Sequence, residues 1–129
     1  LLNFSHPITD LQIGQVRALT GAETDQVIAL PVQSDVQRPF EPQLHDLLAR
    51  LPVSPAKMQG EPMLLNLPSL NYIAAMLLAE LHGRIGHFPA VLRLRPVAGS
   101  VPTRFEVAEI VDLQGLRDSA RAMRQGAQV

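Results

Sequence analysis

The sequence predicts an α/β fold: a Rossmann-like domain with a mostly parallel sheet of about five strands. Two features of the sequence lead to this fold class. Short apolar runs that suit strands alternate with segments of helical periodicity through the first three units of the chain, as in parallel strands joined by right-handed crossovers. Only residues 96–103, with a turn expected over 96–102, separate the last two apolar runs, so these runs should form an antiparallel hairpin at one edge of the sheet.

The first unit runs from the N-terminus to Gly21. Residues 1–5 are expected to form a short buried strand that is broken at His6-Pro7. Thr9 or Asp10 suits the N-cap of the helix that follows, because either side chain can accept a hydrogen bond from the first helical turn. Apolar residues then recur at roughly helical spacing as far as Gly21, where the helix should end.

The second unit extends from residue 27 to Pro52. Residues 27–32 are apolar enough for a second strand, and residues 34–39 are expected to form a polar loop. Pro42 stands where a helix would begin, because proline is favoured in the first helical turn. This helix should stop at Pro52. Its apolar stripe consists of Leu44, Leu47, Leu48 and Leu51.

The third unit follows a connection, residues 53–62, that we expect to be irregular because three prolines fall between positions 52 and 62. Residues 63–67 form the third expected strand. A helix should begin near Pro68 or Ser69 and run to residue 82, with Gly83 as its stop. That helix is apolar almost all round, which predicts that it is buried on more than one side.

The last three elements follow in quick succession. Residues 90–95 and 104–111 are the fourth and fifth expected strands, and they form the predicted hairpin. Asp112 could cap a final helix over residues 113–124. A polar tail should follow from about residue 125.

Size and composition are those of one folded domain over residues 1–129. Hydrophobic residues make up 47% of the chain, which argues against intrinsic disorder. The apolar runs are too short for a transmembrane helix, and the first residues lack the basic start and long apolar stretch of a signal peptide. Cysteine is absent, so disulfides and thiol chemistry are excluded. A cytoplasmic location fits this composition best.

The charge balance argues against a protein that binds long nucleic acid. Eleven basic residues stand against 12 acidic ones, for a formal net charge of −1, whereas such proteins usually carry a basic excess. Tyr72 is the only tyrosine and tryptophan is absent, so stacking of single-stranded bases is poorly supported. A compact anion remains possible as a ligand, because one pocket can be basic on a nearly neutral protein.

Open parallel sheets bind ligands beyond the carboxyl ends of their strands, and Ser5-His6-Pro7 follows the first expected strand. The Ser5 hydroxyl and the His6 imidazole could bind a phosphate, and His6 could act as a general acid near neutral pH. Alternatively, Ser5 satisfies backbone groups of the loop and His6 points to solvent. No obvious partner for a catalytic triad is present.

A second candidate loop, Asn66-Leu67-Pro68-Ser69, follows the third expected strand and opens the most apolar helix. Amide groups at a helix N-terminus favour anions, and Asn66, Ser69 and Asn71 would add side-chain donors around Pro68. Neither a GxGxxG fingerprint nor a P-loop lysine is present. The plainer alternative is that Ser69 only caps the helix.

Arg93 and Arg95 lie two apart on an expected strand and therefore share one face of the sheet. Strands covered by helices are usually apolar on both faces, so two arginines there are informative. They could reach a phosphate of the ligand. They could instead pair with Glu106 and Glu109 across the hairpin, and we favour this ion pairing.

The histidines elsewhere in the chain do not indicate a metal site. His82 and His87 lie five apart near Glu80, a spacing that matches no recognised set of metal ligands. They precede a strand and so face away from the expected pocket, where helix capping and packing explain them better. His45 and Asp46 fall on the polar side of their helix. We therefore predict neither a metal nor a cofactor.

The segments LLNFSHPIT and LLNLPSLNYIAAMLLAELHGRIGHFPAVLRLRP, with the small size of the chain, resemble a CRISPR-associated family of type III systems, the Csx-fifteen family of suspected ring nucleases. The resemblance covers most of the chain apart from residues 33–60 and the tail. It implies a Rossmann-like domain related to the CARF domains that sense cyclic oligoadenylates. The implied ligand is cyclic tetra-adenylate, and the implied role is to remove this messenger and so dampen immune signalling.

The resemblance leaves the mode of action open. The messenger could be removed by sequestration alone or by slow, metal-independent ring cleavage with His6 as the acid. A symmetric ring would suit a two-fold homodimer that presents the same loops twice, with possible further assembly on ligand binding. Two other classes of function remain: an interaction or scaffold domain, and a nucleotide-dependent enzyme, which the missing glycine fingerprint weakens.

Overall fold

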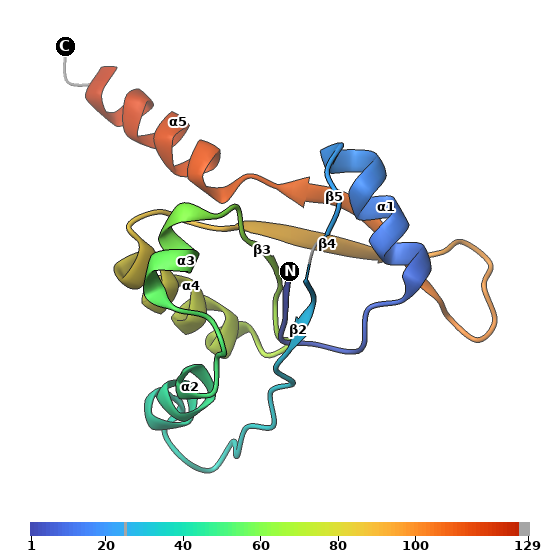
Figure 1. Cartoon of the computed structure of the whole chain (residues 1–129), viewed down its shortest axis with the longest axis horizontal. Coiled ribbons are helices and arrows are strands. Elements are labelled where there is room, and N and C mark those ends of the chain that lie inside the picture. Colours follow the sequence, from blue (N-terminus) through green and yellow to red (C-terminus); the bar gives the residue numbers. More distant parts are fainter. Residues whose placement is uncertain (25, 127–129) are drawn as a thin grey trace.

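A mixed sheet of five strands forms the centre of the protein in a computed structural model that describes residues 1–24 and 26–126 (Figure 1). The strands lie in the order β2-β1-β3-β4-β5, with β5 antiparallel to β4 and the other neighbours parallel. The strands are β1 (Leu2–Asn3), β2 (Ile28–Ala29), β3 (Leu64–Asn66), β4 (Ala90–Pro96) and β5 (Phe105–Val111). The helices are α1 (Asp10–Thr20), α2 (Phe40–Ala49), α3 (Pro55–Gly60), α4 (Asn71–Ile85) and α5 (Leu113–Gly126). The predicted Rossmann-like α/β fold with an antiparallel edge hairpin is confirmed.

The first three strands are shorter than the sequence predicts. β1 and β2 pair through Leu2 and Ile28 and through their next residues. One more backbone hydrogen bond continues the pairing, since the Leu30 N–H donates to the Asn3 carbonyl at 2.8 Å. The next residue, Pro31, has no N–H to add to the ladder, so β2 does not extend over the whole expected range.

The helices cover the two faces of the sheet unequally (Figure 1). On one face, Val16 of α1 packs against Leu92 of β4 and Val107 of β5. On the other face, α2 and α4 enclose the main core, and α3 lies beside α4. Leu77 and Leu81 of α4 are fully buried there, which confirms that this apolar helix packs on the middle of the sheet.

Although α1 connects β1 to β2, two of its side chains bind the outer edge of β5. The Gln12 Nε2 donates to the Phe105 carbonyl at 3.0 Å, and the Val107 N–H donates to the Gln15 Oε1 at 2.8 Å. Gln12 is buried. These two hydrogen bonds place α1 over the β4–β5 side of its face.

The ends of the first two helices follow local sequence signals. Thr9 and Gln12 form a capping box at the start of α1, and Gly21 ends the helix with a left-handed φ of 70°. Both ends agree with the prediction. α2 begins at Phe40, two residues before the expected Pro42. The missing N–H of Pro42 causes no loss there, because donors in the first turn have no partner within the helix.

The prediction of an irregular connection over residues 53–62 is wrong in part, since these residues contain α3. The Ser54 Oγ accepts a hydrogen bond from the Lys57 N–H at 3.1 Å, and Pro55 occupies the first helical position. A serine followed by proline is the sequence signal for such a start.

α4 begins and ends later than predicted. Its N-cap is Leu70, so the expectation that Ser69 caps this helix is wrong. Gly83 lies inside the helix, which continues until the left-handed Gly86, with a φ of 85°. Continuation through Gly83 buries Ile85, which extends the buried stripe and offsets the unfavourable helix propensity of glycine. Neither α4 nor any other described helix is long and apolar enough to cross a membrane.

α5 leaves the body of the protein (Figure 1). The Asp112 Oδ1 accepts a hydrogen bond from the Gly115 N–H at 2.9 Å, so the predicted cap is confirmed. The helix runs to Gly126, two residues beyond the predicted end, and none of its residues is buried. The rest of the expected polar tail, residues 127–129, lies outside the described residues.

A polar cluster on α2 and α4 links the two helices that enclose the main core. The Glu80 carboxylate lies 3.0 Å from the Arg84 guanidinium and 3.5 Å from His45 Nε2. The Arg84 hydrogen bond, helped by the nearby His45, holds the pKa of Glu80 below its ordinary value of 4.5, although partial burial opposes the shift. His45, expected on a solvated face, is thus partly exposed but paired.

We predict that Glu80→Gln lowers the free energy of unfolding at neutral pH, by less than about 1 kcal/mol because the pair is near the surface. A lowered carboxyl pKa stabilises the fold above the ordinary value of 4.5, and this contribution is lost as the pH falls through the folded-state pKa. In urea denaturation, the difference in free energy of unfolding between wild type and variant should therefore shrink as the pH is lowered from about 7 and should be absent at about pH 3. Asp46→Asn, on the exposed side of α2, is the control. A difference that does not change with pH would contradict the lowered pKa of Glu80.

Candidate functional site

The order of the strands places a topological switch point at the carboxyl ends of β1 and β3. The chain crosses from β1 to β2 through α1 on one face, and from β2 to β3 through α2 and α3 on the other. β1 is therefore the point at which the direction of winding reverses. Ligands of such sheets bind at this reversal, outside the carboxyl ends of the strands. The loops at residues 4–9 and 67–70 leave the sheet there.

Both strands end in buried asparagines that bind each other. The Asn66 Nδ2 donates to the Asn3 Oδ1 at 2.9 Å, and the two residues are 6% and 2% exposed. The neighbours of this pair in the sheet are apolar. Burial of an amide is unfavourable unless it is hydrogen-bonded. The pair therefore stabilises one relative position of the two strand ends.

Asn3 also shapes the loop that contains the first two candidate residues. Its Oδ1 accepts a second hydrogen bond, from the Ser5 N–H at 3.1 Å, and its Nδ2 donates to the His6 carbonyl at 2.9 Å. Asn3 thus satisfies the loop backbone, the role that the plainer interpretation gave to Ser5. The half-buried Ser5 hydroxyl and the exposed His6 ring have no hydrogen bond to any described residue. Both side chains are available to a ligand.

The second loop lies beside the first, because the Phe4 N–H donates to the Asn66 carbonyl at 2.9 Å. Pro68 is buried, whereas Ser69 and Asn71 are exposed. α4 starts at Asn71 without a side-chain cap. The N–H groups of its first turn therefore have no side-chain acceptor from the N-cap, and they add a positive partial charge to this edge.

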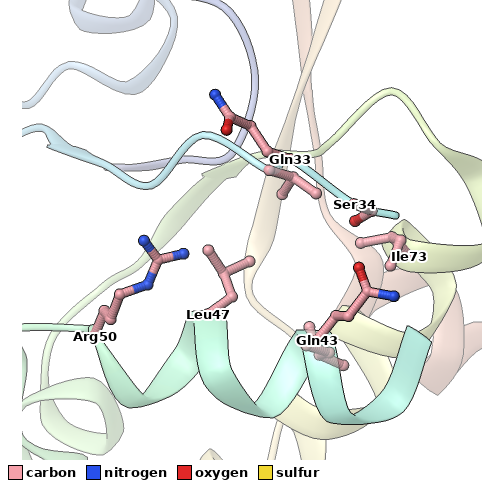
Figure 2. A pocket seen from close by; sticks show the side chains of 8 residues that line it. Gln33, Ser34, Gln43, Leu47, Arg50 and Ile73 are labelled. Atoms are coloured by element: carbon pink, nitrogen blue, oxygen red, sulfur yellow. The ribbon is translucent and has the colours of Figure 1, made fainter. Parts of the chain in front are cut away.

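A small cavity of about 40 Å³ lies near the same edge, between the end of β2, α2 and α4 (Figure 2). Figure 2 shows Gln33 and Arg50 on one side of it and Ser34 and Gln43 on the other. Gln43 holds the loop before α2, since it accepts from the Asp35 N–H at 2.7 Å and donates to the Asp35 carbonyl at 3.0 Å. The Arg50 guanidinium has no ion pair within residues 1–24 and 26–126. The cavity is too small for a nucleotide, and Arg50 places a cation in its lining.

The structure pairs both strand arginines with carboxylates. The Arg93 Nε lies 3.2 Å from Glu109 Oε1, and the Arg95 Nε lies 3.0 Å from Glu106 Oε1. The favoured interpretation of cross-strand ion pairs is confirmed. The alternating residues of β4 pack under α1, so the arginines lie on the opposite face. Because both guanidinium groups already have carboxylate partners, we leave them out of the site.

The prediction that helix capping and packing explain these histidines is confirmed for His82. Its ring packs on Phe88, with centroids 4.4 Å apart, and its carbonyl accepts the N–H of the helix-ending Gly86. Glu80 is engaged with Arg84 and His45. In the part of the chain that the structure describes, no three His, Asp or Glu side chains come together as metal ligands would.

Comparison of the chain with protein-family models, with curated proteins and with solved structures gave no match.

We predict that Asn66→Ala lowers the free energy of unfolding by about 1–3 kcal/mol, because it leaves the buried Asn3 amide with one partner fewer. Asn3→Ala should cost as much or more, since it also frees the loop at residues 5 and 6. The double variant should lose less than the sum, because each single change already removes the shared bond. The exposed Asn71→Ala is the control, within about 0.5 kcal/mol of wild type in urea denaturation. Strict additivity of the two changes would contradict the pairing.

Proposed function

We propose that the carboxyl edge of β1 and β3 binds a cyclic oligoadenylate, with cyclic tetra-adenylate as the expected ring, and that the protein thereby dampens type III CRISPR signalling. The observation that carries the proposal is the Asn3–Asn66 pair. It holds two loops side by side at the winding reversal. The Ser5 and Ser69 hydroxyls have no hydrogen bond to any described residue, and the uncapped N-terminus of α4 follows Ser69 closely in the chain. Hydroxyl and amide donors of this kind suit phosphodiester oxygens.

The choice of ligand class rests on the resemblance to the Csx-fifteen family. The two segments that carry the resemblance contain the two loops, and these loops adjoin at one edge of the sheet. The cavity described near this edge, of about 40 Å³, is too small for a nucleotide. The ring would therefore lie on an open surface and be enclosed by a second copy, whose loops would repeat the same contacts about a two-fold axis.

The same geometry favours sequestration over fast cleavage. Ring opening would form a bond from a ribose 2′ oxygen to the adjacent phosphorus and break the phosphorus bond to the next 5′ oxygen. His6 would supply the proton of the leaving 5′ oxygen, and the 2′ proton would pass to solvent. His6 is exposed, and no described residue orients its ring. We therefore infer slow turnover at most, with tight binding as the main means of removing the messenger.

A protein-interaction role is the second candidate, and one observation favours it. The amphipathic α5 has no buried residue. A helix of this kind is typical of an association surface.

We predict that the double variant Ser5→Ala, Ser69→Ala binds radiolabelled cyclic tetra-adenylate at least about 100-fold more weakly than wild type, as expected for two hydrogen bonds to charged phosphodiester groups at about 1.5–3 kcal/mol each. Thr103→Ala, at an exposed position of the β4–β5 loop, should bind like wild type. Rings of three and six adenylates, tested beside the tetramer, establish the preferred size. Urea denaturation of each variant separates lost affinity from lost stability. Unchanged affinity in the folded double variant would place the ligand elsewhere.

We further predict that His6→Ala abolishes any linear product while its affinity stays within about tenfold of wild type, because one neutral hydrogen bond contributes about 0.5–1.5 kcal/mol. His87→Ala, near the amino end of β4, should leave both properties unchanged. Chromatography of the adenylate products over hours measures cleavage. Wild-type protein that binds the ring and releases no product would establish sequestration as the whole activity. Cleavage that persists in His6→Ala would exclude His6 as the acid.

A further inference from the structure

A groove of about 540 Å³ lies at the end of the sheet opposite the candidate site, against about 40 Å³ for the cavity in Figure 2. It opens at the amino ends of β1, β2 and β3. The connection from α1 to β2 forms one wall and α3 forms the other. Much of its lining is apolar, including Val16, Ile28, Val53, Met58 and Met63.

The position of α1 leaves this groove open. Gln12 and Gln15 hold α1 at the outer edge of β5, and Val16 packs under β4 and β5. α1 therefore covers the β4–β5 side of its face, and on that face it leaves the amino ends of β1, β2 and β3 uncovered. Apolar surface exposed in a hollow of this size is typical of a binding surface.

α5 presents the complementary feature, an apolar helix face with nothing packed on it. Leu116 is 62% exposed and Met123 is 75% exposed, and seven residues apart they share one side of the helix. Arg117, Arg121 and Arg124 follow one another at helical spacing on a different side. At about 1.5 Å per residue, the helix is about 21 Å long. An isolated helix of this length is marginal in water, so we expect a partner to stabilise it.

The first turn of α5 directs the helix away from the groove of its own chain. Leu113 packs against the main core, on the face covered by α2 and α4. The Phe88 N–H donates to the Gln114 Oε1 at 2.9 Å, and Asp112 caps the turn. Figure 1 shows the helix leaving the body of the molecule from that turn. None of the described residues of α5 lines the groove of its own chain.

We propose that α5 of one copy lies in the groove of a second copy, and that the exchange is reciprocal about a two-fold axis. The apolar side of α5 would cover the lining of the groove. Arg121 and Arg124, which have no ion pair among the described residues, lie on one side of the helix and would face the exposed carboxylate of Glu61 beside the α3 wall, whose present partner Lys57 is 3.9 Å away. Two equivalent contacts form at once, which helps the pair approach the roughly 800 Å² per partner that stable interfaces bury.

This dimer is independent of the proposed ligand. Its contacts lie at the amino ends of the strands, whereas Ser5, His6 and Ser69 lie at the carboxyl ends. It should therefore form without any adenylate, and failure of the ligand proposal would leave it standing.

Light scattering tests the dimer. The wild-type chain at micromolar concentration should have twice the mass of one chain, which is 14.1 kDa. The double variant Leu116→Asp, Met123→Asp should raise the dissociation constant by about 100-fold or more, because it puts charges into a buried apolar contact. Gln125→Glu, on another side of the same helix, should leave the mass at that of a dimer. All variants should melt cooperatively, since no residue of α5 is buried in the chain. A wild-type monomer, or a dimer indifferent to the apolar substitutions, would overturn the proposal.

Cross-linking identifies what α5 contacts. The chain has no cysteine, so single cysteines can be introduced without further changes. An equimolar mixture of Met123→Cys and Glu61→Cys, treated with a short bis-maleimide, should give a covalent dimer that contains one of each variant. Met123→Cys alone should give little dimer. Efficient cross-linking of Met123→Cys with itself would show that two α5 helices pair with each other and would exclude the groove as the docking site.

Discussion

One hydrogen bond between two buried amides, from Asn66 to Asn3, determines the geometry of the candidate site. It joins the last residues of two neighbouring strands, and the side-chain amide of Asn3 also binds the loop that follows β1, through Oδ1 to the Ser5 N–H and through Nδ2 to the His6 carbonyl. The sheet could have ended in apolar side chains at these positions, as it does elsewhere. Directional bonds are satisfied in one arrangement only, whereas apolar side chains tolerate several. The pair therefore gives the edge a defined shape.

Sequence signals from neighbouring residues were sufficient to predict those features that depend only on neighbouring residues. The alternation of strands and helices, the Thr9 capping box and the left-handed Gly21 all follow from neighbouring residues, and the structure confirms them. The boundaries of α4 needed tertiary information. Whether Gly83 ends that helix or is included in it depends on what Ile85 packs against. The short α3 is a local feature that was not predicted. Its Ser54-Pro55 start is a helix signal in the sequence, but the surrounding prolines favoured an irregular connection.

The two candidate loops were predictable from the sequence, but the hydrogen bonds that join them were not. Ser5, His6 and Ser69 could be identified because ligand sites of parallel sheets follow the strands. The role of Asn3 could not, because its partner is 63 residues away and no periodicity marks a buried amide pair. Arg50 was also missed, since only the packing of α2 against the end of β2 brings it to this edge. From the sequence, Arg93 and Arg95 could either bind a ligand or form ion pairs. The register of the hairpin places them opposite Glu109 and Glu106, which favours the ion pairs.

The two glutamines of α1 have a further consequence for the behaviour of the chain in a crowded solution. A seven-residue outer strand such as β5 offers unpaired backbone groups to any extended peptide, and sheets grow or aggregate by such additions. In this protein the carbonyl of Phe105 and the N–H of Val107 are already engaged by amide side chains. The opposite border, β2, is only two residues long and is followed by Pro31. Both borders of the sheet thus discourage the recruitment of foreign strands.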